Sequence, residues 1–257
     1  MYEEILVKRV EPILKKDGSK SQQYWNTFSN ASVRKALTES ADADIDEKIQ
    51  LWILINAMEE YTPKKSIFTP DAKVNAPQGS GIKVVVLNFD TAIGCVNRLN
   101  GICELCGSCY SFRAERNPSA CKYHMAQAIW ANTHSAEEIS MMLELLEADY
   151  CRLQENGDIT TIEQCQKIFD TAKKSPQVKF WGFTKSPIAI EFFEQVKLNN
   201  ELPNLQMLDS TCESDILDHF EVVNSDYVEQ DGDHMCIGNC FEHNYDCFYR
   251  GHKCRKH

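Results

Sequence analysis

The sequence lacks long apolar runs and long basic runs. No stretch approaches the roughly 18 apolar residues of a membrane-spanning helix, and the acidic start, residues 1–5, lacks the apolar region of a secretory signal. The formal charge of −11 and the scattered basic residues argue against a grip on duplex nucleic acid through phosphate contacts. We therefore expect a cytoplasmic protein that works neither in a membrane nor on duplex nucleic acid.

Several sequence motifs of common enzymes are also missing. No GxGxxG or GxxxxGK[ST] loop occurs, so nucleotide binding through such loops is not indicated. No GxSxG turn is present to carry a nucleophilic serine. The C-x3-C-x2-C order of radical S-adenosylmethionine (radical-SAM) enzymes is absent from the first group of cysteines. Binding of SAM therefore has no motif to support it.

Cysteine, by contrast, is plentiful, with 12 residues in the chain. Cys103, Cys106 and Cys109 form a C-x2-C-x2-C run, the spacing of the first three cluster ligands in bacterial ferredoxins. Three thiols this close cannot all pair with one another, but they can converge on one metal or one cluster. The ferredoxin motif continues with a fourth cysteine that is missing here, so Cys95 or Cys121 would have to complete the site. Cys121 could equally face the core from a helix.

A second group of cysteines lies near the end of the chain, in a segment without clear periodicity. Its members have the spacing C-x3-C-x6-C-x6-C and are Cys236, Cys240, Cys247 and Cys254. An irregular segment of this length buries little core of its own, so a bound metal or cluster would replace that core. His234, His243 and His252 are interleaved with these thiols and could complete a mixed zinc site, although four thiols already suffice.

Three interpretations of the cysteines compete. Without an export signal the thiols are expected to be reduced, which disfavours a disulfide framework. Zinc is usually bound by two separate C-x2-C pairs, whereas the first group has one such pair plus an overlapping third cysteine, which fits zinc less well. We therefore expect iron–sulfur clusters, of the [4Fe-4S] type, at two sites, with zinc as the alternative. Cys151 and Cys165 stand at helical positions and are interpreted as core residues, and Cys212 is left unassigned.

The pattern of apolar residues predicts an α/β fold. Helices are expected within residues 1–75, over 120–132, from a Ser135–Glu138 capping box to about Leu153, from Thr160 onward, and from Ser186-Pro187 to about Lys197. In the helix from Thr160, the residues expected to face inward are Ile162, Cys165, Ile168 or Phe169, and Ala172. Strands are expected at 83–89, 178–183, 205–208 and 220–223, with a helical turn over 213–218. This alternation predicts a partial (βα) barrel or open parallel sheet. Its domains would be a helical extension (1–80), the α/β core (81–225) and the cysteine-rich tail (226–257).

Four features in this order resemble the phage-associated family called gene product 88, whose members occur in phages, mobile elements and anaerobic prokaryotes. They are an apolar strand, cysteines ending in Cys109-Tyr110, the segment Trp181-Gly-Phe-Thr-Lys-Ser186 followed by Leu202-Pro-Asn-Leu205, and the second cysteine group. The resemblance covers residues 83–254. It implies a partial barrel related to radical-SAM enzymes and binding of iron–sulfur clusters. The extra cysteine in the C-x2-C-x2-C run departs from the family's first cluster.

The resemblance also indicates which residues would act. It supports Cys95, Cys103 or Cys106, and Cys109 as ligands of the first cluster, and the four tail cysteines as ligands of the second. Thr184, Lys185 and Ser186 fall at a strand end, where active sites of such folds collect, although a helix cap and a surface lysine explain them as well. We expect a redox or electron-transfer protein with an unidentified redox partner or small-molecule substrate. A zinc-stapled interaction module and a SAM-dependent radical enzyme with unusual cluster spacing are the alternatives.

Overall fold

The computed structural model describes residues 68–70, 75–92, 95, 109, 111, 114, 118–222, 234–235 and 254–256, with only the backbone for some of them. The predicted helices within residues 1–67 and most of the cysteine-rich tail lie outside these ranges. Within the described residues, no helix is both long enough and apolar enough to cross a membrane.

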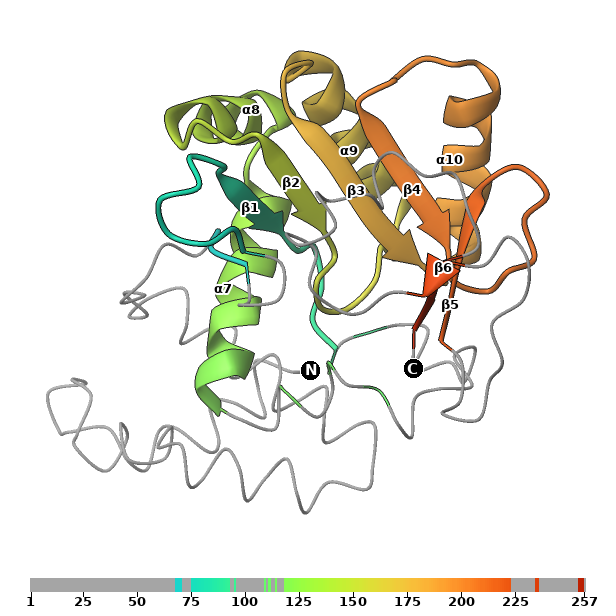
Figure 1. Cartoon of the computed structure of the whole chain (residues 1–257), viewed down its shortest axis with the longest axis horizontal. Helices are drawn as coiled ribbons and strands as arrows, with labels where there is room; N and C mark the ends of the chain where they lie inside the picture. The colour runs from blue at the N-terminus through green and yellow to red at the C-terminus, as the bar shows by residue number, and fades with distance from the viewer. Residues whose placement is uncertain are drawn as a thin grey trace, which may run out of the picture.

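The described strands form one parallel sheet in the order β1-β2-β3-β4-β5-β7-β6 (Figure 1). The strands are β1 (Val84–Leu87), β2 (Tyr150–Leu153), β3 (Lys179–Thr184), β4 (Leu205–Asp209), β5 (Asp218–Val222), β6 (His234–Met235) and β7 (Cys254–Lys256). Strands β1 to β5 lie side by side in chain order, and all neighbouring pairs are parallel. The prediction of an open parallel sheet is thus confirmed.

The helices connect successive strands and gather on one face of the sheet (Figure 1). They are α7 (Pro118–Thr133), α8 (Ala136–Leu145), α9 (Ile162–Lys174) and α10 (Pro187–Leu198). Parallel strands that follow one another in chain order, joined by right-handed crossovers, place their helices on the same side. The main core lies between, where Leu153 and Phe180 of the sheet pack with Ile168 of α9.

Alternation along the strands sends a different set of side chains to the other face of the sheet. Val84 and Trp181 are buried there and pack with Tyr150 and Phe183. Gly182 between Trp181 and Phe183 faces the helices, and a Cβ at this position would lie 2.9 Å from the Leu153 Cβ. The glycine of the Trp-Gly-Phe segment therefore allows β2 and β3 to pair beneath the main core.

The predicted helix from Ser135 to Leu153 is wrong in its second half. The Ser135–Glu138 capping box is present, but α8 ends at Leu145. Glu147 takes a left-handed φ of 52°, which reverses the chain and starts β2 at Tyr150. A helical spacing of apolar residues predicted the longer helix, whereas the actual strand is stabilised by ladders to β1 on one side and β3 on the other.

Three smaller predictions also need correction. Ile162 begins α9 but is 51% exposed, although Cys165, Ile168 and Ala172 face inward as predicted. The helical turn predicted over 213–218 is a loop that leads into β5. Ser186 occupies the N-cap position of α10, with Pro187 behind it, but its side chain makes no capping hydrogen bond.

Candidate functional site at the carboxyl edge of the sheet

Polar side chains concentrate at the carboxyl ends of β1 to β4. Each of these strands ends in a loop, and parallel strands bring such loops to one edge. The buried polar residues at this edge are Asn88 and Thr91 after β1, Gln154, Glu155, Asn156 and Asp158 after β2, Thr184 and Ser186 at the end of β3, and Asp209 at the end of β4. Buried polar groups need hydrogen-bond partners, and their partners show how the edge is built.

The loops after β1 and β2 are held together by Asn88. Its side-chain oxygen accepts the backbone N–H of Glu155 at 2.7 Å, and its amide donates to Gln127 of α7 at 2.5 Å. The same loops touch at Gly157, which has a φ of 71° and where a Cβ would lie 2.7 Å from the carbonyl carbon of Asp90. Only glycine suits both the conformation and the contact.

The loop after β2 is joined to β3 by Asp158. Its carboxylate accepts the Thr184 hydroxyl at 2.6 Å and the backbone N–H of Lys185 at 2.9 Å. The Lys185 ammonium donates to the carbonyl of Ser210, after β4, at 2.9 Å, and the N–H of Ser186 donates to the Thr184 hydroxyl at 3.0 Å. Thr184, Lys185 and Ser186 thus lie at the strand end, as predicted, where they link three successive loops.

Cys95 and Cys109 of the first cysteine group lie on this same side of the sheet. Cys95 follows the loop after β1, where its N–H donates to the carbonyl of Ala92 at 3.4 Å. Cys109 stands two residues before Ser111, whose hydroxyl donates to the carbonyl of Glu155 after β2 at 3.4 Å. Both cysteines are half-buried. Cys95 thus follows the loop after β1, and Cys109 stands two residues from a contact with the loop after β2.

The other predicted ligands are not placed. Cys103, Cys106, Cys236, Cys240 and Cys247 lie outside the described residues, and only the backbone is described for Cys121 in α7 and for Cys254, the first residue of β7. Among the residues that the structure does describe, no three His, Cys, Asp or Glu side chains converge as a metal site. The ligand sets of both predicted clusters stay predictions.

The cysteines interpreted as core residues are indeed buried. Cys165 lies on the inner face of α9, as predicted, whereas Cys151 lies in β2 rather than in a helix. Burial raises the pKa of both thiols, that of Cys165 to about 12. They therefore stay protonated at neutral pH and are poor metal ligands. Cys212, left unassigned, is half-buried beyond β4 with a left-handed φ of 62°.

Asp209 at the end of β4 is buried, yet its pKa is lowered. Burial by itself raises the pKa of this carboxyl, but the Thr211 hydroxyl and the backbone N–H groups of Ser214, Thr211 and Glu213 donate hydrogen bonds that outweigh it. The carboxylate thus acts as the acceptor around which the loop after β4 folds. These hydrogen bonds explain why the residues after β4 form a loop rather than the predicted helical turn.

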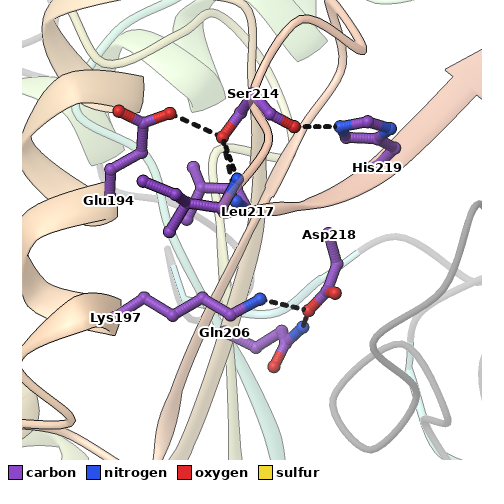
Figure 2. A network of polar contacts seen from close by, with 8 residues as sticks. Glu194, Lys197, Gln206, Ser214, Leu217, Asp218 and His219 are labelled. Atoms are coloured by element: carbon purple, nitrogen blue, oxygen red, sulfur yellow. Dashed lines mark hydrogen bonds and ion pairs between the residues drawn. The ribbon is translucent and has the colours of Figure 1, made fainter.

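Ser214, Glu194 and His219 bring together the residue types of a catalytic triad, but with different geometry (Figure 2). The Ser214 hydroxyl donates to Glu194 at 2.6 Å and accepts the N–H of Leu217 at 2.9 Å. His219 Nε2 contacts the backbone carbonyl of Ser214, at 2.6 Å, rather than its hydroxyl. A base that does not reach the hydroxyl cannot activate it. We interpret this network as a link between α10 and the start of β5.

Sequence reasoning missed Arg152. The residue lies in β2, where a helix was predicted to continue to about Leu153, and no role was predicted for it. In the sheet it is only 5% exposed, on the face that carries Trp181 and Phe183. The only sequence signal was its position between the two buried residues Cys151 and Leu153.

The family model described as Gene product 88 matches residues 57–237, more than half of the chain. The matched region contains the whole first cysteine group, Cys121 and, from the second group, Cys236. No curated protein and no solved structure matches the chain.

Proposed function

Because the chain belongs to the gene product 88 family, a phage-associated family, we propose from this membership and from the geometry of the carboxyl edge that it is an iron–sulfur protein with a redox or electron-transfer role. The observation that carries the proposal is that Cys95 follows the loop after β1, while Ser111, two residues after Cys109, contacts the loop after β2. Cys103 and Cys106 lie between them in sequence and would supply the remaining thiols. Iron–sulfur clusters are held by such sets of thiolates.

The surroundings of these two loops fit a cluster in a second respect. Gln154 follows β2 directly and is 4% exposed. Its side-chain oxygen accepts the N–H of Phe89 at 3.1 Å, but its amide nitrogen has no hydrogen-bond partner within the described structure. A buried N–H donor without an acceptor is costly. Cluster sulfurs commonly accept N–H hydrogen bonds, so a cluster at this edge would provide the missing acceptor.

The number of thiols that bind decides which chemistry follows. If Cys95, Cys103, Cys106 and Cys109 all bind, every iron of a [4Fe-4S] cluster is ligated and the site is suited to electron transfer. If only three bind, one iron stays open to a substrate, which favours the SAM-dependent alternative. The four tail cysteines would hold a second cluster, of which only Cys236 falls inside the family match. Zinc bound by the same thiols would instead make the protein an interaction module.

Anaerobic purification followed by analysis of iron, acid-labile sulfide and zinc tests the proposal. We expect about eight iron and eight sulfide per chain, as two [4Fe-4S] clusters require, and a broad visible absorption that bleaches on reduction. A colourless protein with stoichiometric zinc and no sulfide, after attempted cluster reconstitution, would refute it. An EPR spectrum of the reduced protein that SAM leaves unchanged would separately exclude the radical alternative.

A further inference from the structure

Arg152 is a second feature of the sheet that indicates a bound ligand, and it is independent of the cysteines. It stands in the middle of β2, paired with Val86 of β1 and Trp181 of β3. All these residues point to the face of the sheet opposite the main core, because Cys151 and Leu153, its neighbours in the chain, belong to that core. Arg152 is 5% exposed, so its charge is nearly removed from water.

The guanidinium group of Arg152 makes few contacts with the described residues. One of its nitrogens donates to the carbonyl of Leu153 at 3.0 Å. Its central carbon lies 4.2 Å from the ring centroid of Phe183 and 5.9 Å from that of Trp181. In the part of the chain that the structure describes, no carboxylate forms an ion pair with it. A guanidinium has five N–H donors. Within the described residues the Leu153 carbonyl accepts from one nitrogen, and the other nitrogens are not among the fully buried atoms without a partner, so a ligand can reach them.

Charged groups in protein interiors are normally paired, because aromatic contacts offset only part of the lost hydration. We propose that Arg152 is the anchor of a binding site for a small-molecule oxyanion, a carboxylate or a phosphate. The planar fork of arginine matches both groups through two parallel hydrogen bonds. The proposal uses none of the cysteines as ligands and stands whether or not the protein holds a cluster.

The aromatic residues beside Arg152 indicate the rest of the ligand. Phe183 is stacked on Phe220 of β5, with ring centroids 4.1 Å apart, and both rings are half-buried. By the register of the strands, both rings lie on the carboxyl side of Arg152, towards the edge where ligands of parallel folds bind. A ligand with an oxyanion at one end and a flat or apolar body would use both features. We therefore expect aromatic carboxylates or phosphate esters rather than cationic compounds.

Thermal unfolding of the full chain with inorganic phosphate or benzoate, at ionic strength matched with sodium chloride, tests this site. At least one probe should raise the melting temperature of the native chain in a saturable way, since a ligand that binds only the folded state stabilises it. The Arg152→Met variant should fold, melt at least as high without ligand, and show no response. Phosphate and benzoate compared at equal concentration distinguish the two classes of oxyanion.

Lys179→Met provides the matched control. Lys179 lies on the same face of the sheet, 5.5 Å from the ring centroid of Tyr150, but is half-exposed. Its loss should leave the response to the probes unchanged. Arg152→Lys keeps the charge and loses the fork, so binding should weaken by about tenfold or more. This variant decides the question if Arg152→Met does not fold. A native chain that responds to neither probe, or an Arg152 variant that binds as tightly as the native chain, would overturn the proposal.

Discussion

Among single residues, Asp158 connects two strands at the carboxyl edge. The residue is 6% exposed, and its carboxylate joins the loop after β2 to Thr184 and Lys185 at the end of β3. A buried carboxylate stays ionised only where hydrogen bonds replace its hydration. Thr184 therefore contributes to the structure of this edge. If a Thr184 variant loses activity, its stability has to be measured as well before the loss is assigned to catalysis.

Replacing Thr184 by Val should cost about 1.5–3 kcal/mol of unfolding free energy, because a hydrogen bond to a buried charge is lost. The matched control is Thr171→Val in α9. Thr171 is equally buried, and its hydroxyl donates at 2.7 Å, but to the neutral carbonyl of Lys167. That variant should cost about 0.5–1.5 kcal/mol. Urea unfolding of both variants measures the difference, and equal costs would show that the Asp158 carboxylate contributes nothing special.

At the scale of elements, the helices begin in two different ways. The first turns of α8 and α9 have reciprocal capping boxes, in which Ser135 pairs with Glu138 and Thr161 with Gln164. By contrast, α10 begins at Ser186 and Pro187 with no side-chain cap, and the two residues before Ser186 donate hydrogen bonds to Asp158. The hydroxyl of Ser186 therefore does not contribute a capping hydrogen bond to α10.

Ser135→Ala should lower the unfolding free energy by about 1 kcal/mol, since it removes the oxygen that accepts the N–H of Glu138. Ser186→Ala, at the equivalent position of α10, should change it by only a few tenths of a kcal/mol. Thermal or urea unfolding checks both. If Ser186→Ala leaves stability intact but lowers redox activity, Ser186 has a functional role. A cost equal to that of Ser135→Ala would contradict the described capping.

At the scale of the whole molecule, strands β1 to β5 follow one another across the sheet, and the helices cover one face. The loops after the strands therefore meet at one edge, near which Cys95 and Cys109 lie. Arg152 lies on the face of the sheet opposite the helices. The two cysteine groups are separated by most of the α/β core in the sequence. We expect each group to bind its own cluster independently of the other.

Replacing Cys103 and Cys106 together by Ser should therefore reduce the iron content by about half, with the second cluster retained. Replacing Cys240 and Cys247 by Ser should remove the other half. Cys165→Ala is the control, since this buried thiol lies in the core and its loss should lower stability but not iron content. Iron and sulfide analysis after anaerobic purification measures all three. Complete loss of iron from either double variant would indicate one shared site, and global unfolding of the Cys103/Cys106 variant would favour a structural zinc site.

Most of the α/β core was predictable because its signals are local. The β-branched run at Val84–Leu87 and the cap signal at Ser135 depend on neighbouring residues alone, and both are confirmed. The helix start predicted at Thr160 is one residue early, since Thr161 and Gln164 form the capping box. The segment Tyr150–Leu153 was not predictable in this way. Its residues fit a helical stripe as well as a strand, and its position between β1 and β3 decides the outcome. Because a helix was predicted here, nothing in the sequence indicated that Arg152 would be buried in a sheet.

The sequence by itself determined the parallel α/β class, the placing of Thr184 to Ser186 at a strand end, and the two groups of cysteines that make metal binding the leading hypothesis. These follow from residue type and short spacing, which do not depend on distant contacts. Only the tertiary structure decided that Asp158 meets Thr184 across 26 residues, and that an arginine is buried beside two aromatic rings. Such features arise when distant segments pair in a sheet, and no local pattern in the chain specifies them.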